Sequence, residues 1–122
     1  MSSLITVLVL VEGPLTSKMV HLVVDSGATT TMISPHTAMA IGCEANLSEK
    51  HAPIITASGF VYMPLMKIPL IACLGVEIKN LEIICHQLPA ESIVQGVLGL
   101  DFLRHVPAFQ EFEKKILDLG KP

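Results

Sequence analysis

The sequence predicts a mostly β domain, and three observations support this prediction. Runs rich in valine, isoleucine and threonine recur along the chain, and these β-branched residues favour strands. Glycine and proline separate the runs at short intervals, as turns between strands require. With 122 residues, 51% hydrophobic and 16% charged, the chain has the size and composition of a single folded domain over residues 1–122.

The first part of the chain should form two strands and one short helix. Strands are expected over Leu4–Val11 and Lys18–Val24, because both are rich in apolar and β-branched residues and flank a Gly-Pro turn. Residues His36–Ile41 should form the helix. Ser34-Pro35 supplies an N-cap and a first-turn proline before it, and Gly42 is suited to end it.

The remainder should be mainly strands, divided at Gly59 and Gly75. The expected strands are Pro53–Ser58, Phe60–Lys67, Ile68–Leu74, Val76–His86 and Ile93–Leu98. The segment Gly99–Arg104 has a more helical pattern. The end of the chain, Phe109–Leu119, is predicted as a closing hairpin that turns around Lys114.

Charge and hydropathy exclude several kinds of partner. The net charge is −3, and lysine and arginine are scattered, so no basic face for nucleic acid is expected. No apolar run approaches the roughly 20 residues needed to cross a bilayer, so no membrane contact is expected. Cys43, Cys73 and Cys85 are odd in number and widely spaced. They fit buried thiols in a reducing compartment, which predicts a cytoplasmic location.

Two short segments suggest the chemistry. An apolar strand delivers Asp25, followed by Ser26-Gly27-Ala28-Thr29, and taken alone this is ordinary turn chemistry. Much later, Val97-Leu98-Gly99 forms a second apolar strand that ends in glycine. Together the two segments resemble the signatures of retropepsin-like aspartic proteases, in their single-domain microbial and cellular form. The resemblance implies a closed all-β barrel with one or two short helices and one half of an active site.

The resemblance also assigns roles around the first segment. Asp25 would be the catalytic acid, and the Ser26 hydroxyl would brace the loops of two chains across a symmetry axis. Gly27 would permit a tight loop, since a side chain there would crowd the cleft. Ala28 and Thr29 would contact the substrate.

Further roles fall on later parts of the chain. Leu98 and Gly99 would pack beneath the aspartate loop without reacting. Ser58 and Gly59 would form the tip of a hairpin flap that closes over a bound peptide and contacts it. Asp101 is interpreted as a helix cap and not as a second catalytic acid.

The implied reaction needs two carboxyl groups, and each chain offers one. Peptide hydrolysis by this route uses one carboxylate to activate a water while a carboxylic acid protonates the carbonyl oxygen. Two copies of Asp25 at a homodimer axis could share one proton and do both. The expectation is therefore a homodimeric aspartic endopeptidase that acts on extended peptide or protein substrates without a cofactor or metal.

Other interpretations compete with this one. The same dimer could bind or scaffold peptides without cleaving them, or the chain could be a monomer that assembles only at high concentration or acid pH. A serine hydrolase would use Ser26 as nucleophile, but the chain has no Gly-x-Ser-x-Gly elbow. Cys85-His86 could suggest a metal site, but adjacent strand residues point to opposite faces.

Overall fold

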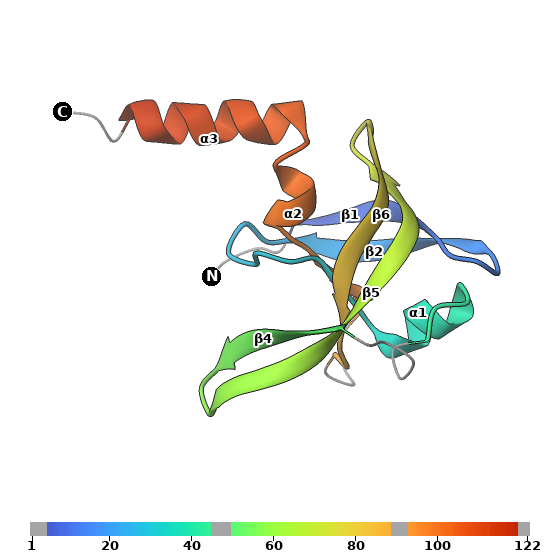
Figure 1. Cartoon of the computed structure of the whole chain (residues 1–122). Coiled ribbons are helices and arrows are strands. Elements are labelled where there is room, and N and C mark those ends of the chain that lie inside the picture. Colours follow the sequence, from blue (N-terminus) through green and yellow to red (C-terminus); the bar gives the residue numbers. More distant parts are fainter. Residues whose placement is uncertain (1–4, 45–49, 89–92, 120–122) are drawn as a thin grey trace.

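The fold is a closed β barrel, as the sequence led us to expect. The computed structural model describes residues 5–44, 50–88 and 93–119. Its strands are β1 (Thr6–Glu12), β2 (Ser17–Val24), β3 (Met32–Ile33), β4 (Lys50–Thr56), β5 (Gly59–Cys73), β6 (Val76–Cys85) and β7 (Gly96–Leu98). They pair in the order β1-β2-β7-β3-β6-β5-β4, and a further pairing of β1 with β5 closes six of them into a ring. Strand β4 lies outside the ring and forms a projecting hairpin with β5 (Figure 1).

Strand β7 contains most of the second sequence segment, Val97-Leu98-Gly99, and pairs with the strand that leads to Asp25. It runs parallel to β2, with Val24 opposite Leu98, and antiparallel to β3. A Cβ atom at Gly96 would lie 2.0 Å from the Met32 carbonyl oxygen, so only glycine fits here. This close approach holds β7 between β2 and β3, directly beneath the loop that connects those two strands.

The core fills the inside of the barrel. Along β1 and β2, Val9, Val11, Val20 and Leu22 are buried while their neighbours in sequence are more exposed. This alternation is the period-two pattern of a strand with one face inward. Phe102 is the largest side chain that is fully buried. The barrel therefore provides a rigid base for the loops at its open end.

Within the described residues, three helices accompany the barrel: α1 (Pro35–Ala40), α2 (Leu100–Leu103) and α3 (Pro107–Leu119). The expected capping of α1 is present, because the Ser34 hydroxyl accepts a hydrogen bond from the Thr37 amide at 3.2 Å. No helix in the described part of the chain is long and apolar enough to span a membrane.

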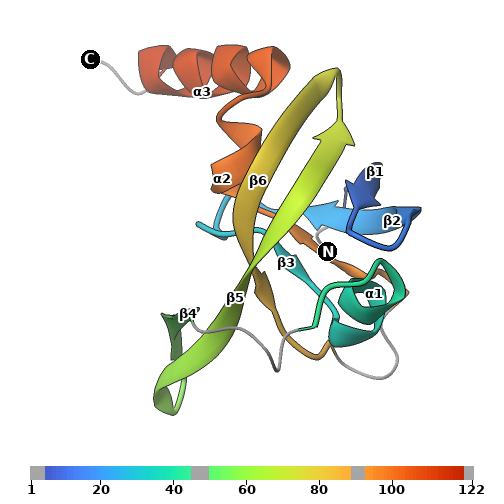
Figure 2. The same cartoon turned by 45° about the vertical axis from the view of Figure 1, so that its right-hand side comes forward.

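The predicted hairpin at the end of the chain is wrong. Residues Pro107–Leu119 form one continuous helix that stands out from the barrel in both views (Figures 1 and 2). Apolar residues recur there at helical spacing, and proline at the first position favours a helix start. The charged stretch around Lys114 lies on the exposed side of this helix and makes no turn.

Two strand predictions also needed correction. Strand β5 is one 15-residue strand, where the sequence suggested two that divide after Lys67. Pro69 has no paired residue opposite it in β6, where Asn80 takes a positive φ of 58°, so the strand continues past the proline. Strand β7 contains only the last three residues of the predicted Ile93–Leu98 strand. Leu4, the predicted start of the first strand, lies outside the described residues.

Candidate active site

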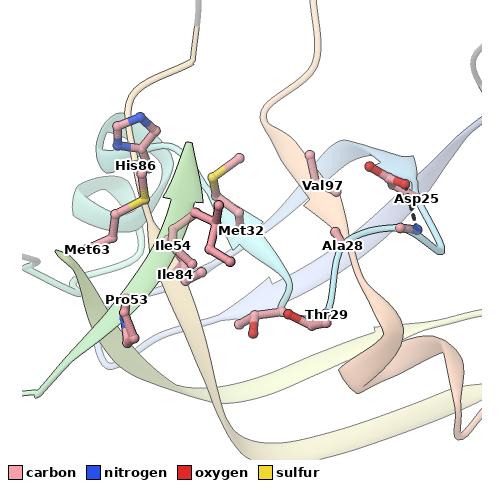
Figure 3. Close-up of a pocket in the computed structure, with 13 residues that line it drawn as sticks. Asp25, Ala28, Thr29, Met32, Pro53, Ile54, Met63, Ile84, His86 and Val97 are labelled. Carbon is pink, nitrogen blue, oxygen red and sulfur yellow. Dashed lines mark hydrogen bonds between the residues drawn. The ribbon is translucent and has the colours of Figure 1, made fainter. Parts of the chain in front are cut away.

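Asp25 lies at the end of β2, on a loop that the barrel holds in place. Its backbone amide donates a hydrogen bond to the Leu98 carbonyl oxygen at 3.1 Å. Its carboxylate accepts one from the Gly27 amide at 2.9 Å, the dashed line in Figure 3. The side chain is otherwise exposed. The carboxylate is therefore oriented by its own loop and open to a reacting molecule.

The residues beside Asp25 share this exposed loop. Ser26 and Thr29 are exposed, and Ala28 is half-buried. A Cβ atom at Gly27 would come within 3.1 Å of the Asp25 carboxylate oxygen Oδ1, closer than nearly all normal contacts. A side chain at this position would therefore require the Asp25 carboxylate to shift by a few tenths of an ångström.

The segment after β7 lies directly under the loop. Leu98 is fully buried, and a Cβ atom at Gly99 would lie 2.8 Å from the Ala28 carbonyl oxygen. The Leu100 amide donates to that same oxygen at 2.8 Å. Leu98 and Gly99 therefore lie where they can support the loop through packing and close backbone contact.

Thr31 and Asp101 form a polar brace that the sequence analysis missed. The buried Thr31 hydroxyl donates to Asp101 Oδ1 at 2.6 Å and accepts from the Gly99 amide at 3.0 Å. The Thr31 amide donates to Asp101 Oδ2 at 2.9 Å. These bonds tie the end of the aspartate loop to the start of α2.

The interpretation of Asp101 as a helix cap is therefore wrong in position. Gly99 is the N-cap of α2, and Asp101 lies in the first turn, where its carboxylate also accepts from the Phe102 amide at 2.8 Å. Both carboxylate oxygens are engaged in bonds within the chain. The run of three threonines before Met32 was the sequence signal for the polar brace, but the sequence alone did not say which of these threonines faces inward.

A cavity of about 570 Å³ opens beside Asp25. Its lining combines the aspartate loop with four strands from different parts of the barrel and with the outer strand β4 (Figure 3). The lining residues are Asp25, Gly27, Ala28, Thr29, Thr30, Met32, Pro53, Ile54, Ile55, Met63, Ile84, His86 and Val97. Most are apolar, which suits side chains of a bound peptide better than a highly charged ligand.

The β4–β5 hairpin forms one wall of this cavity through Pro53, Ile54 and Ile55. Its two-residue turn is Ala57-Ser58, and Gly59 begins β5 with a positive φ of 113°. Ser58 and Gly59 therefore lie at the end of the hairpin, as expected for a flap tip, but neither lines the cavity of the single chain.

Other chemistries find no support in the described residues. No group of three or more histidine, cysteine, aspartate or glutamate side chains there could hold a metal ion. His86 lies at the opposite end of the cavity from Asp25, so it does not pair with the neighbouring Ser26 (Figure 3). Burial raises the pKa of Cys73 to about 11. Burial, and to a smaller extent electrostatic repulsion from Cys43, raises the pKa of Cys85 to about 11 as well. These thiols are poor nucleophiles near neutral pH.

Comparison with known proteins gives a family match and similar folds. Residues 11–105 match the family model described as gag-polyprotein putative aspartyl protease. A retropepsin-like aspartic protease from Rickettsia conorii superposes with a TM-score of 0.64 at 17% identity, covering 84% of this chain and 78% of that one. EIAV protease complexed with the inhibitor HBY-793 superposes with a TM-score of 0.61 at 18% identity, covering 85% and 88%. No curated protein sequence matches.

Proposed function

Because the chain belongs to the gag-polyprotein putative aspartyl protease family, we propose that it is an aspartic endopeptidase that is active as a homodimer. The observation that carries the proposal is the position of Asp25. It is the exposed, loop-oriented carboxylate at the edge of an apolar cavity. The similar fold of two aspartic proteases supports the same reaction class.

The reaction requires a second carboxyl group, which we assign to a second copy of the chain. Asp25 is the only carboxylate among the described residues that line the cavity, and Asp101 is engaged by Thr31. With two copies of Asp25 face to face, one carboxylate takes a proton from water while the other, protonated, donates to the substrate carbonyl. The water oxygen attacks the carbonyl carbon, and the peptide C–N bond then breaks as its nitrogen takes up a proton.

The proposed substrate is an extended segment of a peptide or protein. The cavity lies between the aspartate loop and the β4–β5 hairpin, whose backbone could pair with an extended chain. The proposed substrate contacts are Ala28 and Thr29 on the loop, together with Ser58 and Gly59 at the hairpin end of either copy. Ser26 is the proposed brace between the two loops.

No cofactor is part of this scheme, and a cytoplasmic location stays a proposal, consistent with three free cysteines.

Replacing Asp25 tests the proposal. Wild type and the Asp25→Asn variant are compared against a peptide library from pH 4 to 7, with and without a hydroxyl-bearing transition-state mimic. We expect wild type to cleave and the variant to lose at least about 10³-fold in kcat/KM, because it cannot form the acid–base pair. Equal activity of both proteins would refute the proposal. Peptide binding by both proteins without cleavage by either would instead support a non-catalytic peptide-binding dimer.

A further inference from the structure

Helix α3 carries an apolar face that the other described residues do not cover. Phe109, at the start of the helix, packs against the core. Phe112 and Ile116 follow on the same face but are 60% and 52% exposed. We call Phe109, Phe112 and Ile116 the α3 stripe. Every other described side chain from Pro107 to Ile116 is exposed, so the helix leaves the barrel with its apolar face bare.

The spacing of the stripe is that of a helix that pairs with another helix. Positions 109, 112 and 116 are three and four residues apart, and the sequence continues this spacing at Leu119. Alternating steps of three and four give the 3.5-residue repeat of a coiled-coil seam. Glu113 and Lys115 flank the seam, where charged residues are usual. Glu111 and Lys114 lie on the opposite, polar face.

The stripe begins at a second uncovered apolar surface. A recess of about 480 Å³ lies at the root of α3, between the helix, the β5–β6 turn and the end of β2. It is lined by Val24, Leu74, Leu103, Val106, Pro107, Ala108 and Phe109. Phe109 belongs to both the recess and the stripe, and Val24 immediately precedes Asp25. The apolar surface therefore runs from the aspartate loop along α3.

The direction of α3 relates this surface to the active site. In Figure 1, α3, the loop after β2 and the β4–β5 hairpin all project to the left side of the barrel. A second copy whose aspartate loop faces this one across a two-fold axis would therefore lie on the same side of the barrel as α3. In a two-fold pair the same patch is used by both copies, so one self-complementary stripe is sufficient.

We propose that α3 is a dimerisation element: the α3 stripes of two copies pack together and help to bring the two Asp25 loops face to face. The second part of this inference, that the dimer brings the two Asp25 loops face to face, rests on the proposed protease function. The helix is only about 20 Å long, so an isolated pair would be weak. The recess and the aspartate loops must add contact area, and the dimer should dissociate on dilution.

Charge favours a second copy over a membrane surface as the occupant. Between Pro107 and Leu119 the sequence has two lysines against three acidic residues, a net charge of −1 (2 − 3). Helices that lie on anionic membranes usually carry a basic polar face. The mixed charges of α3 are instead typical of helices that pair in water.

Two double variants test the role of α3. Phe112→Gln/Ile116→Gln removes the exposed part of the stripe without changing net charge. Glu111→Gln/Lys114→Gln is the matched control, since it replaces two exposed residues on the opposite face and also keeps net charge. Glutamine is a good helix former, so circular dichroism should show the helix in both variants. Sedimentation velocity over a wide concentration range gives the dimer dissociation constant, and peptide cleavage is followed at the same concentrations.

We expect the stripe variant to raise the dimer dissociation constant by about 10- to 100-fold, and the control by less than about threefold. Cleavage by the stripe variant should return at concentrations where its dimer forms again. A stripe variant that dimerises like wild type, or a wild type that is monomeric throughout, would overturn the inference. Binding of wild type and the stripe variant to anionic phospholipid vesicles is measured as well. If the stripe variant loses vesicle binding and its dimerisation is unchanged, the inference is overturned too. A stripe-dependent dimer that cleaves no peptide would support the inference and refute the proposed protease function.

Discussion

At the scale of single residues, the position of the Asp25 loop depends on a buried side-chain network beneath it. Thr31 and Asp101 are far apart in sequence and share two hydrogen bonds, and the Gly99 amide at the start of α2 donates a third to the Thr31 hydroxyl. Buried polar groups that lose a partner cost more than an ordinary hydrogen bond contributes. The brace should therefore matter for both stability and the alignment of Asp25.

Replacing Thr31 should show this. Thr31→Val removes the hydroxyl and leaves the Gly99 amide and Asp101 Oδ1 without that partner, which should lower the free energy of unfolding by about 1–3 kcal/mol. Thr31→Ser keeps the hydroxyl and should lose about 1 kcal/mol for the missing methyl group. Urea unfolding at one fixed protein concentration measures both. Equal stability of the valine variant and wild type would contradict the assigned role.

At the scale of elements, the β4–β5 hairpin is built differently from the barrel strands. Ile55, Phe60 and Tyr62 are all strongly exposed, and the hairpin projects from the barrel (Figure 1). An element with few buried contacts opens at low free-energy cost, as a flap must. Its shape then depends on the turn, where Gly59 takes a conformation that other residues rarely adopt.

Replacing Gly59 by alanine should therefore affect catalysis through the hairpin. The positive φ of 113° makes an alanine there strained by about 1–2 kcal/mol, although no atom obstructs its Cβ. The distorted turn should reduce kcat/KM by about 10- to 100-fold. Gly75→Ala is the control, because Gly75 also has positive φ and open space but lies in the β5–β6 turn. Both variants are assayed well above the dimer dissociation constant, since that turn borders the recess at the root of α3. Similar losses of kcat/KM in both variants would argue against a specific role of the hairpin.

At the scale of the whole molecule, the described residues provide one carboxylate in the cavity, Asp25, and an exposed apolar face on α3. The barrel presents the aspartate loop, the flap-like hairpin and α3 on one side (Figure 1). A symmetric dimer would pair the two carboxylates and cover the exposed stripe in a single step. Dimer formation and activity should therefore depend on protein concentration in the same way.

Mixing wild type with the Asp25→Asn variant tests this coupling. If subunits exchange freely, an equal mixture contains roughly one quarter wild-type homodimers, so activity per total protein should fall to about one quarter. If the active site were complete within one chain, about one half of the wild-type activity per total protein would instead remain. The mixture is measured above the dimer dissociation constant, with buffer-diluted wild type as the reference.

A mostly β domain and the capping of α1 could be predicted from residue patterns, and the resemblance to retropepsin-like proteases implied the closed barrel and the Leu-Gly strand beneath the aspartate loop. These follow from local residue chemistry and from a motif whose parts must pack together. Which threonine faces Asp101 and which side chains line the cavity became clear only from the three-dimensional arrangement. The helix over residues 107–119 did not need the tertiary structure, because its helical apolar spacing and its first-position proline are both present in the sequence. Inward-facing positions, in contrast, depend on the register between distant strands, which the pattern within one segment does not contain.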